Sequence, residues 1–128
     1  MIEAIRTHLL SVSAITAEIS DRFDPFIRVE PGTDALPAVM YEVQSEEPLQ
    51  GLAHTGLYFS TLQLTTISDR MSNADDVADL LEANLENHTS TTVQNCKLIN
   101  VEREELQPID GGEDYYFLTI QTWEIWHA

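Results

Sequence analysis

Four aspartates stand close together in the stretch from Leu64 to Leu85, and carboxylates at such density could bind a metal ion or exchange protons with a substrate. They are Asp69, Asp75, Asp76 and Asp79. The helical pattern of the same stretch favours another interpretation. Ser72 lies three residues before Asp75 in a weak capping box, and Asp75 and Asp76 would occupy the first helical turn, where carboxylates meet the positive helix end. An EF-hand needs a loop where this sequence has a helix, so we predict a helix start and no metal site.

The other side chains that could act as nucleophiles, bases or metal ligands are scattered along the sequence. No two histidines have the i, i+4 spacing of a helical metal pair, since they stand at His8, His54, His88 and His127. Cys96, the only cysteine, excludes an internal disulfide and a cysteine-based zinc site, and its strand pattern predicts a packed thiol. The glycine-rich residues 110–114 are typical of a hairpin loop. We therefore predict no catalytic, cofactor-binding or metal-binding residue, and a small hydrolase would lack a nucleophile–base pair.

Charge is the most unusual property of the composition. The 128 residues contain 22 Asp and Glu against 6 Lys and Arg, which gives a net charge of −16. Because a nucleic-acid backbone is bound by clustered cations, this balance argues against nucleic-acid binding. Two interpretations stay open: a soluble surface from a salt-adapted source, or an acidic surface that faces DNA or a cationic partner. No apolar run approaches the ~20 residues of a membrane span, and the length predicts a single domain over residues 1–128.

The first part of the chain has one helical region followed by strand patterns. Apolar residues at three- and four-residue steps predict helix over residues 2–19, divided at Ser11-Val12-Ser13, with Ser13 as the cap of a second short helix. Residues 26–29 and 36–43 have strand patterns. Residues 46–56 are polar and contain one proline and two glycines, so we predict a long, mobile hairpin loop there.

The second part alternates strand, helix, strand and strand. Residues 57–66 predict a strand, and residues 73–87 predict a helix with the buried stripe Ala74, Val77, Ala78, Leu81 and Leu85. Residues 93–105 predict a strand, in which the apolar alternation slips between Leu98 and Ile99 and so indicates a β-bulge. Large side chains on both sides of residues 115–126 predict a final strand with both faces covered.

This order of elements, α-β-β-β-α-β-β, defines the expected fold. The strands on either side of residues 44–57, and those on either side of residues 106–114, can pair as antiparallel hairpins. The predicted fold class is α+β: an antiparallel, or mixed, β-sheet of about five strands with two α-helices packed on it.

Four short motifs follow one another along nearly the whole chain. They are Asp21-Arg22-Phe23-Asp24-Pro25 after the first helical region, Leu36-Pro37-x-Val39-x-Tyr41 at a strand start, Leu62-Gln63-Leu64 before the helix at 73–87, and Glu124-Ile125-Trp126-His127 at the end. In order and spacing they resemble the tail-completion family of long-tailed phages, also called tail terminators. The strong acidity and the single lysine, Lys97, depart from that family and leave open which surface faces a partner.

The resemblance implies a structural protein of the virion tail, not an enzyme, with no cofactor. Family members form a homo-oligomeric ring, commonly a hexamer, on the head-proximal end of the tail tube. The ring ends tube polymerisation and offers a surface for head-connector joining. The implied partners are other copies of this chain, the tail tube protein and the head-completion or connector protein. DNA would pass through without specific binding, no membrane would be involved, and assembly would take place in the host cytoplasm.

Candidate contact residues come from the two long predicted loops and the last strand. Residues 46–56 and 107–114 exceed what a tight hairpin needs, and Trp126 falls on the strand face opposite Trp123. The candidate subunit or tube interface is therefore Leu49, Gln50, Leu52, His54, Ile109, Asp110 and Trp126. Because a wall of carboxylates repels phosphates, Glu102 and Glu104 are the candidates for the lumen; alternatively, they keep an outer strand soluble.

The rival hypothesis is a small acidic protein-binding module or DNA mimic with no enzymatic activity. Such a mimic needs carboxylates spaced along one face as phosphates are. The acids of this sequence fall in several predicted loops and helix starts, which weakens this second hypothesis.

Overall fold

A break in the N-terminal apolar stripe separates two short helices. In the computed structural model, which describes residues 1–25, 36–50, 54–106 and 115–128, α1 spans Ile2–Leu10 and α2 spans Ser13–Ile19. Val12 between them is extended, and its carbonyl oxygen accepts the backbone N–H groups of Ile15 and Thr16. The predicted break is confirmed, but the cap is Val12 and not Ser13, because the chain turns one residue earlier and Ser13 already belongs to the helix.

The strands form one five-stranded mixed sheet. β1 is Phe23–Asp24, β2 is Ala38–Gln50, β3 is His54–Ser68, β4 is Val93–Leu106 and β5 is Tyr116–His127. Their order in the sheet is β1-β2-β3-β5-β4, in which β1 is parallel to β2 and the other neighbours are antiparallel. The predicted α+β fold is confirmed, with three helices in place of two. The strand expected at residues 26–29 lies outside the described residues, and β1 comes before it.

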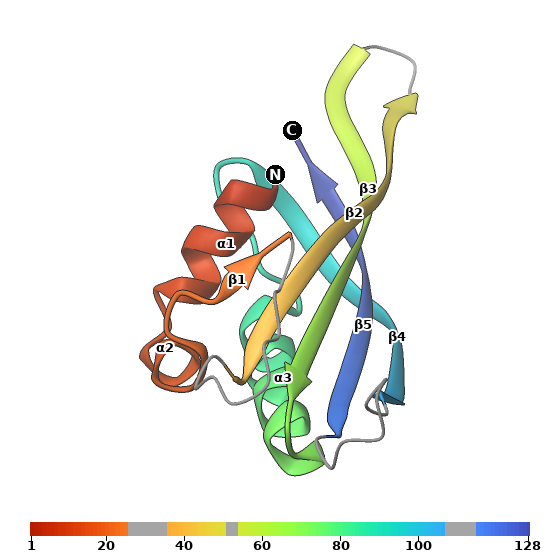
Figure 1. The fold of residues 1–128 in the computed structure, drawn as a ribbon. Coiled ribbons are helices and arrows are strands. Elements are labelled where there is room, and N and C mark those ends of the chain that lie inside the picture. The colour runs from red at the N-terminus through yellow and green to blue at the C-terminus, as the bar shows by residue number, and fades with distance from the viewer. Residues whose placement is uncertain (26–35, 51–53, 107–114) are drawn as a thin grey trace.

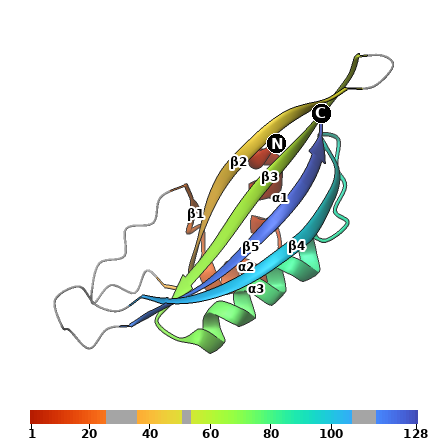
Figure 2. The same ribbon diagram turned by 90° about the vertical axis from the view of Figure 1, so that its right-hand side faces the viewer.

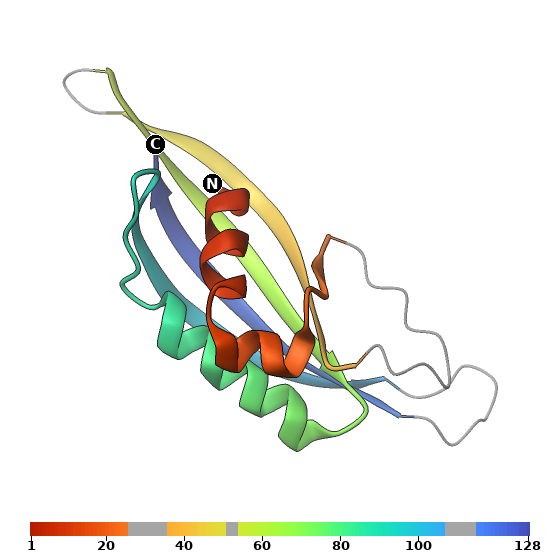
Figure 3. The ribbon, with the colours of Figure 1, turned by 90° about the vertical axis from the view of Figure 1, so that its left-hand side faces the viewer.

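β2 and β3 form a two-stranded arm that projects past the end of β5 (Figures 1, 2 and 3). Residues 46–48 pair with residues 58–60, and pairing resumes between Gln50 and His54. The predicted loop is therefore wrong for residues 46–50 and 54–56, and residues 51–53 lie outside the described residues. The polar side chains of this stretch led to the loop prediction, because a strand with exposed side chains lacks the apolar alternation that identifies a strand. Pro48 fits this strand because an edge strand does not need every backbone N–H for pairing.

β4 and β5 carry the burial pattern of a half-covered sheet. The register shifts between Leu98 and Asn100, which confirms the predicted β-bulge. Burial alternates along β5, and the prediction that both its faces are covered is correct for one face only. The buried residues of that strand, all on the helix side, are Thr119, Gln121, Trp123, Ile125 and His127.

All three helices lie on the same face of the sheet, as Figures 1 and 3 show from two sides. α3, Met71–Leu85, buries the predicted stripe from Ala74 to Leu85, so that prediction is confirmed. Its residues join one core cluster with fully buried side chains of the sheet, namely Leu62, Leu64, Trp123 and Ile125. Each such aliphatic side chain stabilises the fold by about 1.5–3 kcal/mol relative to exposure, so this single interface holds the helices in place.

The aspartate cluster does not start the helix. α3 begins at Met71, its N-cap is Arg70, and no carboxylate lies in its first turn, so the interpretation of Ser72 and Asp75 as a capping box is wrong. The Oδ1 atom of Asp75 instead accepts hydrogen bonds from Arg103 Nε and Thr119 Oγ1, both at 3.0 Å. Asp75 thus ties α3 to β4 and β5, a role that a spacing rule within one helix cannot reveal.

We predict that Asp75→Ala lowers the free energy of unfolding by about 1–2 kcal/mol, mainly because it leaves the buried Thr119 hydroxyl without its acceptor. The ion pair with Arg103 adds little, since both of its side chains are partly exposed. Asp76→Ala is the matched control, because Asp76 is exposed on the same helix and undergoes the same change in helix propensity. Urea denaturation of both variants measures the difference, and equal losses would contradict the bridging role.

Candidate functional site

A serine and a histidine that lie far apart in sequence meet at the end of the sheet. Ser60 Oγ lies 2.7 Å from His127 Nε2, so a hydroxyl and a base do lie within hydrogen-bond distance. The expectation that the chain lacks such a pair is wrong in this geometric sense. His127 Nδ1 lies 3.1 Å from the main-chain oxygen of Ala128, which can only accept, so Nδ1 donates and Nε2 accepts the Ser60 hydroxyl. In a hydrolase triad that Nδ1 proton is held by an acid, but the nearest carboxylate, Glu46, lies 3.8 Å from Nε2.

Burial decides what this pair does. Ser60 is 0% exposed and His127 is 2% exposed, and the ring of Tyr58 stacks on the imidazole with centroids 5.7 Å apart. A substrate cannot reach a hydroxyl in this position. The pair therefore satisfies two buried polar groups between β3 and β5, at the root of the projecting arm.

Cys96 is packed in the core, as the sequence predicted. Its side chain is 0% exposed, and burial, with a smaller contribution from the Glu86 carboxylate, raises the pKa of the thiol to about 12. A nucleophilic cysteine needs the thiolate form near neutral pH. Cys96 is thus a small core side chain and not a catalytic one.

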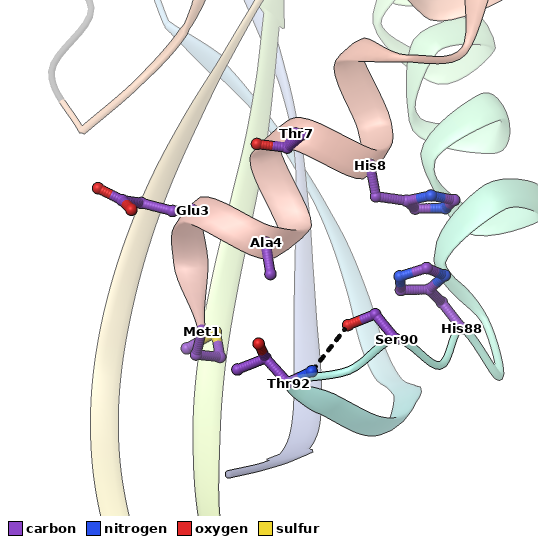
Figure 4. A pocket seen from close by; sticks show the side chains of 8 residues that line it. All are labelled: Met1, Glu3, Ala4, Thr7, His8, His88, Ser90 and Thr92. Atoms are coloured by element: carbon purple, nitrogen blue, oxygen red, sulfur yellow. Dashed lines mark hydrogen bonds between the residues drawn. The ribbon is translucent and has the colours of Figure 1, made fainter.

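One open pocket of about 550 Å³ lies between α1 and the connection from α3 to β4 (Figure 4). It is lined by Met1, Glu3, Ala4, Thr7, His8, His88, Ser90 and Thr92. The rings of His8 and His88 stack in parallel there, so their in-plane lone pairs do not converge on one ion. Within the described ranges, no group of three or more His, Cys, Asp or Glu side chains could hold a metal ion.

The face of the sheet opposite the helices is the remaining candidate surface, and we call it the open sheet face. Figure 2 shows its strands in front of the helices, and the described residues place no helix over it. The strand registers assign to it the outward-facing residues of four strands. Those with polar or aromatic side chains are Glu42, Ser45, Glu47, Phe59, Thr61, Gln63, Thr65, Asn95, Lys97, Asn100, Glu102, Glu104, Tyr116, Thr122, Glu124 and Trp126, and Leu118 and Ile120 lie among them.

This face is acidic. Its described residues include five glutamates and one cation, Lys97, and Lys97 is paired directly with Glu124. Three arginines serve elsewhere: Arg6 donates to the carbonyl oxygen of Phe23, Arg22 to that of Pro37, and Arg103 to Asp75. A phosphate backbone would therefore be repelled from this face.

The predicted site residues fall into three groups. Leu52, Ile109 and Asp110 lie outside the described residues. Leu49, Gln50 and His54 stand at the end of the arm, where the backbone is described and their side chains are not. Trp126, Glu102 and Glu104 lie on the open sheet face.

Within the third group, Trp126 is separate from the two glutamates. Its ring is half-buried and tilted against that of Phe59, with centroids 5.3 Å apart. Glu102 and Glu104 are exposed beside Ile120 and Leu118 toward the other end of β4.

Two strand edges flank the open sheet face. β4 is the last strand of the sheet, and in the described part of the chain its outer edge has no strand beside it. β1 covers the outer edge of β2 only at Val39 and Met40, so residues 41–50 lack a described neighbour on that side. Unpaired backbone groups along an edge can pair with a strand of another chain. Sequence patterns identified both strands but not their positions at the two edges, because strand order depends on contacts between distant segments.

We predict that Cys96 in the native protein resists alkylation at about pH 8, because its raised pKa leaves almost no thiolate and its burial excludes the reagent. The raised pKa means that the folded state favours the protonated thiol, so Cys96 destabilises the fold only when pH rises above the pKa of the unfolded thiol. Mass spectrometry after iodoacetamide treatment measures the reaction, with the urea-unfolded chain as the control. Equal rates in both states would contradict the buried position.

The comparisons with known proteins show the fold. No protein-family model matches the chain, and no curated protein matches it. The described residues contain no helix with both the length and the apolar character to span a membrane. Among solved structures, the chain is similar to one from the "Virion of native gene transfer agent (GTA) particle", with a TM-score of 0.65 and 13% identity. The match covers 97% of this chain and 92% of that one, and so shows a fold shared over almost the full length of both.

Proposed function

We propose that this chain is a structural protein of a phage-like virion that caps the head-proximal end of the tail tube as a ring. The observation that carries the proposal is the fold shared with a chain of a gene transfer agent virion over 97% of this sequence. The motif order that resembles tail terminators points to the same role. In this role the chain ends tube polymerisation, joins the head connector, is not an enzyme, and resides in the virion tail after assembly in the host cytoplasm.

The two strand edges supply a means of closing a ring. β2 and β4 border opposite sides of the sheet, so joining the β4 edge of one copy to the β2 edge of the next is a head-to-tail contact. Copies that share one orientation place these strands antiparallel, since β2 is antiparallel to β3, β3 to β5 and β5 to β4. Such contacts generate a ring when the rotation between copies closes, and the family resemblance suggests six copies.

Charge favours pairing at the arm end of the two edges. Through the sheet, Lys97 is level with Ser45, and Glu47 lies two residues farther along β2 on the same open face. A neighbouring copy at the same height would set its Glu47 diagonally across from Lys97, within reach of a long side chain. At the other end, β1 occupies the edge of β2 at Val39 and Met40, which restricts pairing to the arm end.

The open sheet face is the proposed wall of the channel. Glu102 and Glu104 are exposed on it, and together with Glu42 and Glu124 they would repel passing DNA. The arm end, with Leu49, Gln50 and His54, is the proposed contact with the tube or a neighbouring copy. Trp126 is the proposed aromatic contact on the same face.

We predict that the purified chain caps one end of isolated tail tubes and that Lys97→Glu weakens capping roughly tenfold, through like-charge repulsion with the neighbour's Glu47. The double variant Lys97→Glu with Glu47→Lys should restore capping, because the pair is reversed and not lost. Negative-stain electron microscopy with a concentration series measures the fraction of capped tubes.

The matched control is Lys97→Glu with Asp76→Lys, which has the same net charge as the double variant but alters an exposed residue of α3. If this control restores capping as well, only net charge matters and the proposed pairing is wrong. If the unaltered chain binds no tube, the capping function itself is wrong.

We predict that Glu102→Lys with Glu104→Lys leaves the fold intact, since exposed substitutions usually change stability by only about ±0.5 kcal/mol. The variant should slow DNA ejection from assembled particles, because cations in the channel would hold the phosphates. Asp76→Lys with Asp79→Lys makes the same charge change on the exposed side of α3 and should eject DNA at the normal rate. Time-resolved dye fluorescence measures ejection, and equal rates for the two double variants would contradict the lumen assignment.

A further inference from the structure

Two histidines that are 80 positions apart in the chain stack face to face at the edge of the helical layer. His8 belongs to the last turn of α1, and His88 follows α3. The ring centroids are 3.6 Å apart and the ring planes differ by 13°. Figure 4 shows the two rings lying face to face. The connection is set by Asn87, whose φ of 60° turns the chain and whose N–H donates to the carbonyl oxygen of Cys96. The backbone thus holds His88 against α1.

The hydrogen bonds of the two rings differ. His8 Nε2 lies 2.7 Å from the main-chain oxygen of Asn84, so this nitrogen carries a proton and donates it. That oxygen belongs to the C-terminal turn of α3, where the helix dipole favours a positive charge. His88 Nε2 is buried without a hydrogen-bond partner among the described residues. A proton there would be an unpaired buried donor and a second positive charge against the ring of His8.

Among the described residues, no carboxylate lies within ion-pair distance of His88. Glu3 is the only acid that lines the pocket, and Figure 4 shows its side chain pointing away from both rings. Beyond α3, the Glu86 carboxylate accepts the backbone N–H of Leu98, and Cys96 is a buried neutral thiol. Burial, followed by the charge of His8, lowers the pKa of His88.

We propose that the stacked His8 and His88 rings form a proton-sensitive latch, which fastens the C-terminal end of α1 to the connection after α3 and opens when both rings become charged. α1 contributes the fully buried Ile5 and Leu9 to the core, so opening the latch weakens the cover over one end of the sheet. Because both rings line the pocket, water can reach and hydrate them when the stacked rings separate. The latch does not depend on the proposed function.

The direction of the pH effect follows from the lowered pKa. Between the lowered pKa of the folded state and the ordinary histidine value of 6.5, the unfolded or opened chain binds more protons than the closed one. The contribution of neutral His88 to the stability of the closed state is therefore complete above the ordinary pKa. It is lost as pH falls toward the lowered pKa. Local opening of α1 should accordingly increase as pH falls through that window.

Amide hydrogen exchange, corrected for the intrinsic pH dependence of exchange, tests the latch between about pH 7.5 and pH 5. In the unaltered chain, protection of α1 amides should fall by roughly tenfold or more at the lower pH, while β3 and β5 amides keep theirs. His88→Phe keeps a stacking ring that cannot be charged, and His8→Gln keeps a donor for the Asn84 oxygen. His88→Phe should retain α1 protection at the lower pH, and His8→Gln should retain part of it, because burial still lowers the pKa of His88 when the charge of His8 is removed.

Glu3→Gln is the control, since it removes the only acid of the pocket and should leave the pH dependence unchanged. The latch is overturned if α1 protection in the unaltered chain is constant with pH, or if all amides lose protection together. It is also overturned if both histidine variants keep the full loss, or if Glu3→Gln removes it. Should one histidine variant fail to fold, the other decides by the same criterion.

Discussion

Burial of one side of the sheet beneath three helices is the constraint on which the other features depend. Leu81 and Leu85 of α3, Leu9 of α1, and Leu64 and Trp123 of the sheet all belong to one fully buried cluster. Because α1, α2 and α3 all lie on the same side, the opposite side must remain compatible with water or with a partner. The polar alternation of β4 and β5 follows from this asymmetry, as does the concentration of glutamates on the open sheet face.

The polar contacts that cross the fold attach its ends to this core. Asp75 joins α3 to the two last strands, and Gln121 Nε2 donates to the carbonyl oxygen of Ala78 on the same helix. At the other end, His127 accepts from Ser60 where the arm leaves the sheet. These contacts involve side chains that could take part in catalysis, yet each side chain has a partner within the fold and most are buried, although Gln121 Oε1 has no hydrogen-bond partner among the described residues. These side chains hold separate elements of the fold together.

Local patterns predicted the elements that rest on the core. The stripe of α3 from Ala74 to Leu85 and the β-bulge near Leu98 were correct because they express the period of one element against one apolar surface. The strand that continues through residues 46–48 was missed because these residues pair with residues 58–60 but have exposed side chains, so their polarity imitates a loop. This part of β2 is held by backbone pairing with β3, and the types of its side chains give little indication of that pairing.

Contacts between distant residues were beyond the reach of sequence patterns for a different reason. The capping interpretation of Asp75 used neighbours three residues away, whereas its partners Arg103 and Thr119 lie 28 and 44 positions away. The same holds for His8 and His88, which no spacing rule connects. Trp123 and Trp126 were placed on opposite faces because two-residue alternation is local, but only the helices decided which face became the core.

The partial cover that β1 gives to β2 bears on how a ring would grow. With Val39 and Met40 already paired and the β-bulge interrupting β4 after Leu98, the proposed joint between two copies would be restricted to the arm end of the two edges. A joint restricted in this way would be weak, so an open row of copies would come apart as readily as it forms. A closed ring gains one more joint without gaining a copy, and each departure must then break two joints at once. Short edges would thus make the closed ring persist while incomplete assemblies dissociate. Misassembled rows of copies would then be removed without any further component.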